Sequence, residues 1–181
     1  MKVEQSKVTK LKLTDLDRLD PITIFLEDFE PRKGKITIEC FGKSWSSYWG
    51  GMGDRTIAQF FIDCDNHYLA KNLSSISSTV DDYEEFVNVA KSTIIQRRKQ
   101  CELEQEEARE MFDNINDARY ELNDDDGLAW CKMNSDILHD IFGDDWWYSI
   151  PQKENHEYQY LSLIIDAVRE GLKQVTTAKA A

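Results

Sequence analysis

The 181-residue sequence contains no apolar run near the roughly 18 residues that a membrane span requires. Its opening residues, MKVEQSKVTKLKL, lack the apolar stretch of an export signal. Cysteine is sparse, and no two cysteines form a C-x-x-C pair, which excludes the usual spacing of a disulfide framework or a zinc site. We therefore expect a cytoplasmic protein with no membrane segment. We also expect its four thiols to be reduced: Cys40, Cys64, Cys101 and Cys131.

Basic residues are also scarce. The sequence has 22 lysines and arginines against 34 acidic residues, which gives a net charge of −12 and an isoelectric point near 4.7. Such a field repels phosphate backbones and attracts cationic surfaces, so direct binding to nucleic acid is disfavoured. The same acidity would serve solubility alone, and this alternative stays open.

Catalytic and cofactor motifs are missing too. The serines of 44–47 lack a G-x-S-x-G elbow, and the glycines of 50–53 match neither a phosphate-binding loop nor a dinucleotide fingerprint. Asp63 and His67 share one helix face, but a catalytic zinc needs about three protein ligands. We expect no cofactor, no metal and a binding role rather than catalysis. An enzyme whose site is assembled from distant residues is a third interpretation.

The residues that are present predict an α+β protein. Alternating β-branched residues over about 22–49 predict an antiparallel hairpin or small sheet, and apolar residues at helical spacing predict a mostly helical part over about 54–174. A chain of this length suits one domain, which we expect to span 1–175, followed by a disordered tail over 176–181. The strongest helical periods lie near 56–70, 80–122 and 154–174.

Residues 45–55 join two tryptophans to a glycine-rich turn that can open a helix. A helix N-terminus can hold an anion and tryptophan can stack on a base, so this segment predicts a site for a nucleotide-like ligand. The candidate ligand-binding residues are Trp45, Trp49, Gly51, Gly53 and Arg55. The alternative is that the glycines only allow a tight turn while both tryptophans pack in the core. In either case, at least one of the glycines at 50, 51 and 53 is expected to have a positive φ.

A dense acidic segment follows over 102–126, which contains eleven acidic residues and only two arginines. Its apolar residues keep helical spacing, so it predicts an amphipathic helix rather than disorder. Carboxylates along a helix can be spaced like backbone phosphates, and exposed tryptophan beside acidic residues suits a protein interface. The candidate partner-binding residues are Glu106, Glu107, Glu110, Asp117, Asp124, Asp125, Trp146 and Trp147. The alternative is an ordinary solvated helix face.

A family resemblance rests on Phe41-Gly42-Lys43-Ser44-Trp45 and on the segments 48–55, 60–61 and 64–69. Over residues 11–75 the chain resembles small accessory proteins of phages and prophages of enteric bacteria. The resemblance supplies no catalytic residues. It implies action in the host cytoplasm on an accessory task, such as modulating host metabolism or blocking a defence or restriction system.

Together these observations favour an accessory protein that binds a host protein with a basic surface. A nuclease or a defence factor fits, and the acidic, aromatic-containing surface would act as a mimic of nucleic acid. The alternative function is a small-ligand binder at 45–55. The long amphipathic segment could also pair with a second copy as a homodimer, the commonest closed assembly.

Overall fold

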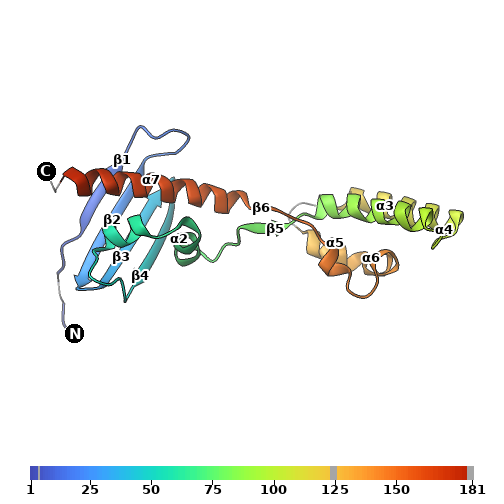
Figure 1. The fold of residues 1–181 in the computed structure, drawn as a ribbon, viewed down its shortest axis with the longest axis horizontal. Coiled ribbons are helices and arrows are strands. Elements are labelled where there is room, and N and C mark those ends of the chain that lie inside the picture. Colours follow the sequence, from blue (N-terminus) through green and yellow to red (C-terminus); the bar gives the residue numbers. More distant parts are fainter. Residues whose placement is uncertain (4, 123–125, 179–181) are drawn as a thin grey trace. The chain divides into compact units, whose positions relative to one another are not determined.

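The computed structural model describes residues 1–3, 5–122 and 126–178 (Figure 1). The contacts divide the chain into two compact units. The sheet unit comprises Met1–Ser78 and Asn155–Ala181, and the helical unit comprises Thr79–Glu154. Each unit has its own cluster of buried apolar residues. The structure confirms the α+β class. The expectation of one cooperative domain over 1–175 stays a prediction.

The sheet unit begins with a four-stranded antiparallel meander, β1 (Thr9–Leu13), β2 (Ile22–Glu30), β3 (Lys33–Cys40) and β4 (Lys43–Trp49). Every second side chain is buried along β3 and along β2 from Ile22 to Leu26, as expected when one face of a sheet is covered. The predicted sheet over 22–49 is confirmed. The fourth strand, β1, lies in a segment for which the sequence did not predict a strand.

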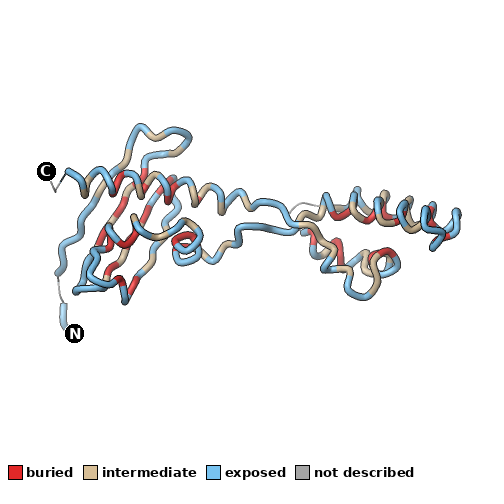
Figure 2. The backbone as a smooth tube through the Cα atoms, viewed as in Figure 1, coloured by how far each residue is buried: buried red, intermediate tan, exposed pale blue. Residues whose placement is uncertain are grey.

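Three helices cover one face of this sheet: α1 (Ile57–Asp63), α2 (Asn66–Leu73) and α7 (His156–Ala178) (Figure 1). The buried residues lie where the strands and these helices face one another (Figure 2). Ile24, Ile36 and Phe61 are fully buried there. Helix α7 continues into the segment 176–181 for which disorder was predicted, and residues 179–181 lie outside the described part of the chain.

The turn between β4 and α1 confirms the prediction for the glycines, because Gly53 has a φ of 66°. Helix α1 then starts with a capping box. The Thr56 hydroxyl accepts a hydrogen bond from the backbone N–H of Gln59, and the Gln59 side chain accepts one from the backbone N–H of Thr56. The Asp28 carboxylate accepts a further bond from the Ile57 N–H at 2.7 Å and so ties α1 to β2.

The helical unit holds α3 (Tyr83–Lys99), α4 (Gln105–Ala118), α5 (Gly127–Met133) and α6 (Ser135–Phe142). A 3-10 turn, η1 (Arg119–Glu121), follows α4, and another, η2 (Trp146–Ser149), follows α6. Two short strands, β5 (Thr79–Asp81) and β6 (Gln152–Glu154), pair antiparallel at the ends of the unit. Phe86, Ile115 and Leu138 are fully buried in its core.

The single helical segment predicted over 80–122 is wrong in one respect, because two helices occupy it. After α3, Cys101 takes a left-handed φ of 61°. The N–H of Glu102 then donates to the carbonyl of Arg97, and the N–H of Cys101 donates to that of Arg98. This pair of bonds is a Schellman motif, which satisfies the last carbonyls of α3 and ends it.

Candidate functional site

Four carboxylates form a stripe along the solvent side of α4. The buried side of this helix is apolar, and it includes Ala108, Met111, Phe112, Ile115 and Ala118. At about 100° per residue, the positions 106, 110, 113 and 117 fall within about 60° of one another, on the opposite side. We call these four exposed residues the acidic stripe: Glu106, Glu110, Asp113 and Asp117.

No ion pair involves the acidic stripe within the part of the chain that the structure describes. Glu107, predicted to belong to the same surface, has a different role. Its side chain accepts a hydrogen bond from the N–H of Glu104 at 3.3 Å and completes the capping box that starts α4. Asp124 and Asp125, which were also predicted, lie outside the described residues.

The net charge of the whole chain resides in the helical unit. The sheet unit has 14 basic and 14 acidic residues, which cancel. The helical unit has 8 basic and 20 acidic residues, which leaves −12 on 76 residues. Solubility alone does not require such a separation, because charges of both signs spread over a surface serve that purpose.

The two predicted tryptophans of η2 have different environments. Trp146 stacks on the buried Phe86, with ring centroids 6.3 Å apart, and so helps close the core of the helical unit. Trp147 packs edge-on against Trp146 and keeps 48% of its surface exposed. The neighbouring Tyr148 is 82% exposed. The exposed aromatic surface is therefore Trp147 with Tyr148, and Trp146 packs against it.

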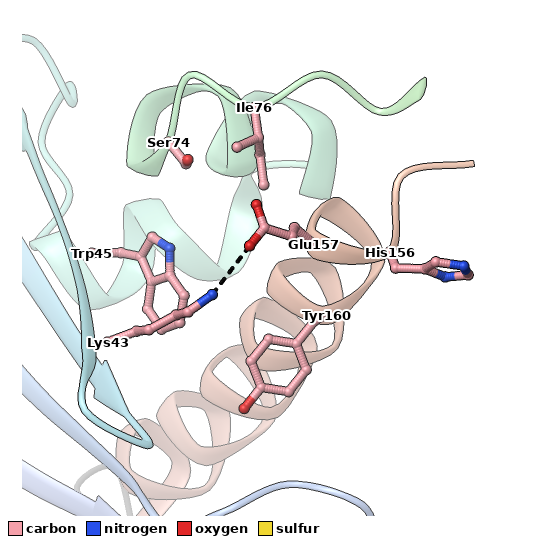
Figure 3. A pocket seen from close by; sticks show the side chains of 7 residues that line it. All are labelled: Lys43, Trp45, Ser74, Ile76, His156, Glu157 and Tyr160. Atoms are coloured by element: carbon pink, nitrogen blue, oxygen red, sulfur yellow. Dashed lines mark hydrogen bonds and ion pairs between the residues drawn. The ribbon is translucent and has the colours of Figure 1, made fainter. Parts of the chain in front are cut away.

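A separate pocket of about 290 Å³ lies in the sheet unit (Figure 3). Residues from β4, from the segment after α2 and from the first turns of α7 line it: Lys43, Trp45, Ser74, Ile76, His156, Glu157 and Tyr160. The Lys43 ammonium and the Glu157 carboxylate are 3.2 Å apart, whereas the His156 ring points away from this pair (Figure 3). The hydrogen bond between Tyr160 and Cys40, together with burial, raises the pKa of Tyr160 to about 12.

The structure does not bring the five predicted ligand-binding residues into this pocket together. Trp49 is buried, donates from its indole N–H to the Tyr68 hydroxyl at 3.0 Å, and packs on Phe60. The Arg55 guanidinium lies over the same Phe60 ring and donates to the Met52 carbonyl and to Asp63. Gly51 and Gly53 border open space. Only Trp45 lines the pocket.

The other pocket residues gave no signal in the sequence. Lys43 and Glu157 are 114 positions apart, and only the packing of α7 on the sheet brings them together. The expectation that Asp63 and His67 share one helix face is wrong, because Asp63 ends α1 and His67 lies in α2. Asp63 pairs with Arg55, and His67 bonds to the Tyr158 hydroxyl. In the described ranges, no group of three or more His, Cys, Asp or Glu side chains is arranged to hold a metal ion.

Comparison with known proteins adds one finding. Residues 1–174 match the model of a protein family described as a phage family. The chain belongs to this phage family. No curated protein and no solved structure matches it. The match takes in both units of the phage protein and confirms the phage origin that the resemblance implied, while the enteric host and the accessory task stay predictions. Among the helices of the described residues, none has the length and apolar character of a membrane span.

Proposed function

We propose that this phage protein acts in the host cytoplasm by docking its helical unit on a basic surface of a host protein, without catalysis of its own. The observation that supports this proposal is the separation of charge, with −12 on the helical unit and no net charge on the sheet unit. A cationic partner would be steered toward the helical unit, because opposite potentials accelerate encounter and suppress wrong orientations.

The acidic stripe fits a surface that normally receives nucleic acid. Its four carboxylates span the twelve residues 106–117 of α4, or roughly 16 Å at the rise of an α-helix. One DNA strand carries a charge about every 3.4 Å of helix axis, so about five phosphates cover the same length. A groove built to neutralise phosphates would therefore meet a similar density of negative charge. A nuclease or a defence factor that binds nucleic acid is the class of partner that this geometry favours.

Charge alone gives steering and orientation more than affinity, so a stable complex also needs buried contact area. Trp147 and Tyr148 supply exposed aromatic surface on the same unit. Aromatic side chains of this kind contribute strongly when a partner encloses them. The proposal therefore assigns long-range attraction to the carboxylates and short-range contact to Trp147 and Tyr148.

The test compares two variants with equal net charge. The stripe variant is E106Q/E110Q/D113N/D117N, and the matched control is D17N/E39Q/D54N/E170Q, which removes four exposed carboxylates from the sheet unit. Each is used to capture proteins from a host lysate, and the affinity for the partner recovered by the wild type is then measured with purified protein. We expect at least a tenfold loss for the stripe variant at low salt and less than a threefold loss for the control. Equal losses for both variants would remove the stripe from the mechanism.

A second candidate function is small-ligand binding at the pocket that Trp45 lines. Its support is the combination of an indole, the Lys43 ammonium and the Tyr160 hydroxyl around one cavity (Figure 3). The volume of about 290 Å³ is at the lower limit for ligand sites. Nucleoside mono- and diphosphates are the probes. A rise in melting temperature that is lost in both Trp45→Ala and Lys43→Gln would support this candidate, and no shift at millimolar ligand would reject it.

A further inference from the structure

The outer edge of β4 presents backbone groups that are free to pair. The two-residue loop Phe41-Gly42 joins Cys40 to Lys43, and φ is positive at both loop residues, as in a type I′ hairpin. In such a hairpin the closing pair is hydrogen-bonded, and bonding alternates along the strand. Residues 43, 45, 47 and 49 therefore bond to β3, whereas the N–H and C=O groups of Ser44, Ser46 and Tyr48 point outward. Within the described chain, no backbone hydrogen bond from another element reaches these three residues.

The two edges of the sheet differ in protection. The other edge strand, β1, is five residues long and carries Lys10 and Lys12, and lysine is a common device against edge-to-edge pairing. Strand β4 is seven residues long, contains no proline, and has Lys43 as its only charged residue. That lysine sits at the end of the strand and pairs with Glu157. An unprotected edge of this length indicates that something covers it.

The exposure and backbone conformation of Phe41, at the end of this edge, are a second and independent indication that the edge is covered. It is 79% exposed and takes a φ of 47°, a conformation that asparagine, aspartate and glycine adopt far more readily. An aromatic residue here is unfavourable both for the turn and for contact with water. The fold of the isolated chain gives no reason for a phenylalanine at this position.

We propose that β4 pairs antiparallel with β4 of a second copy about a two-fold axis at Ser46, so that two sheets join into one of eight strands. In this register, Ser46 lies opposite Ser46 of the second copy. Ser44 lies opposite the second copy's Tyr48, and Lys43 lies opposite its Trp49. No like charges oppose one another, which is why a second copy fits this edge. Phe41 of each chain then reaches the second copy's Gly51, where the space beside the glycine is open.

The expected dimer is of moderate affinity. Ser44, Ser46 and Tyr48 each contribute a donor and an acceptor, which gives about six main-chain hydrogen bonds between the copies. Strand addition of this kind buries an area at the small end of specific interfaces. Sedimentation velocity is therefore run from about 1 to 200 µM, the range in which a micromolar complex forms and dissociates.

Three variants test the edge, and a fourth variant is the matched control. Ser46→Lys places two ammonium groups opposite each other at the axis, and Ser46→Pro removes an outward N–H without breaking the ladder with β3. Phe41→Asn removes the aromatic ring but creates Asn-Gly, the preferred type I′ turn. Thr23→Lys adds the same charge to the same open face, on the inner strand β2.

We expect the wild type and Thr23→Lys to dimerise, both Ser46 variants to remain monomeric with unchanged circular dichroism, and Phe41→Asn to weaken the dimer at least fivefold without loss of thermal stability. Hydrogen exchange gives a residue-level readout. The amides of Ser44, Ser46 and Tyr48 should exchange slowly at 200 µM and rapidly on dilution, whereas those of Trp45 and Ser47 stay slow in both. A wild type that is monomeric at 200 µM would overturn the proposal. So would a dimer that survives both Ser46 variants, or edge amides that become protected only when another protein is added.

Discussion

Neutralising most of the acidic stripe should stabilise the helical unit. In the triple variant E110Q/D113N/D117N, three like-charge contacts within the stripe disappear: 106 with 110, 110 with 113, and 113 with 117. The repulsion between Glu107 and Glu110 disappears too, but the attraction between Arg109 and Asp113 at i,i+4 is lost with it, and these two changes offset each other. Two exposed charges 6 Å apart in water repel by about 0.7 kcal/mol, and physiological salt halves this to about 0.3 kcal/mol. Asp117 also lies in the last turn of α4, where a negative charge opposes the helix dipole by about 0.3 kcal/mol or more. The sum is about 1 kcal/mol of added stability.

Glu106 is left in place because it lies in the first turn of α4, where a carboxylate favours the helix. The assay is thermal and urea unfolding followed by circular dichroism at 222 nm. A gain of 1 kcal/mol corresponds to a rise in melting temperature of about 4–8 °C where the helical unit unfolds by itself and of about 2–4 °C where both units unfold together. The gain should shrink in 1 M NaCl, because the Debye length falls to about 3 Å. The control D17N/E39Q/D54N changes the net charge equally in the sheet unit and should shift stability by less than about 0.5 kcal/mol.

A loss of stability in the triple variant would refute this reasoning, since it would mean that the carboxylates have stabilising partners in the fold. A gain that persists unchanged in 1 M salt would refute the electrostatic cause. The expected gain matters for function as well. Residues that lower stability are often kept because they serve binding, so a stabilising effect of their removal would support a binding role for the stripe.

Three further predictions concern two turns and the titration of Tyr83 and Cys131. Gly53→Val should destabilise the sheet unit by about 1–2 kcal/mol in urea unfolding because of its left-handed backbone, whereas Gly51→Val, without a positive φ, should be nearly neutral. Cys101→Gly should stabilise the helical unit by about 1 kcal/mol, measured in the same way, and a loss would argue against the Schellman turn. Burial raises the pKa of Cys131 to about 11 and of Tyr83 to about 12, so the folded state keeps both protons longer than the unfolded state. The free energy of unfolding should therefore fall as the pH rises from about 9 to 12. Urea unfolding at pH 8 and 10.5 should show a smaller fall for Tyr83→Phe and for Cys131→Ala than for the wild type.

The strands and helices that the sequence predicted well are those whose pattern repeats. Strand β3 alternates over its eight residues, β2 alternates from Ile22 to Leu26, and α7 keeps its apolar stripe over about six turns, so local periodicity was sufficient. Strand β1 was missed although Leu11 and Leu13 alternate with lysines, because the segment is short and lies in a polar terminus. It forms because β2 already offers a free edge.

The break between α3 and α4 was missed for a different reason. In a sequence, a helix end of this type is usually identified by a glycine at the left-handed position, but here Cys101 occupies that position. Only the two hydrogen bonds of the turn reveal it. Three residues of the acidic stripe, Glu106, Glu110 and Asp117, were among the predicted residues because they depend on spacing within one helix, whereas Asp113 was not. The isolation of the stripe from the neutral part of the chain could not be predicted, because the sheet unit joins segments from both ends of the sequence.

The two proposals respond to salt in opposite directions. Docking of the helical unit on a cationic partner gains from attraction, so added salt should weaken that complex and slow its formation. Pairing of two β4 edges brings together chains that each carry −12, while the edge itself has no opposed charges, so salt can only screen repulsion between the copies. The dimer should hold or tighten between 50 and 500 mM NaCl over the range in which partner binding declines. Sedimentation and binding measured on one sample series would separate the two. A dimer that dissociates with salt would show that acidic groups, rather than the β4 edge, hold the copies together.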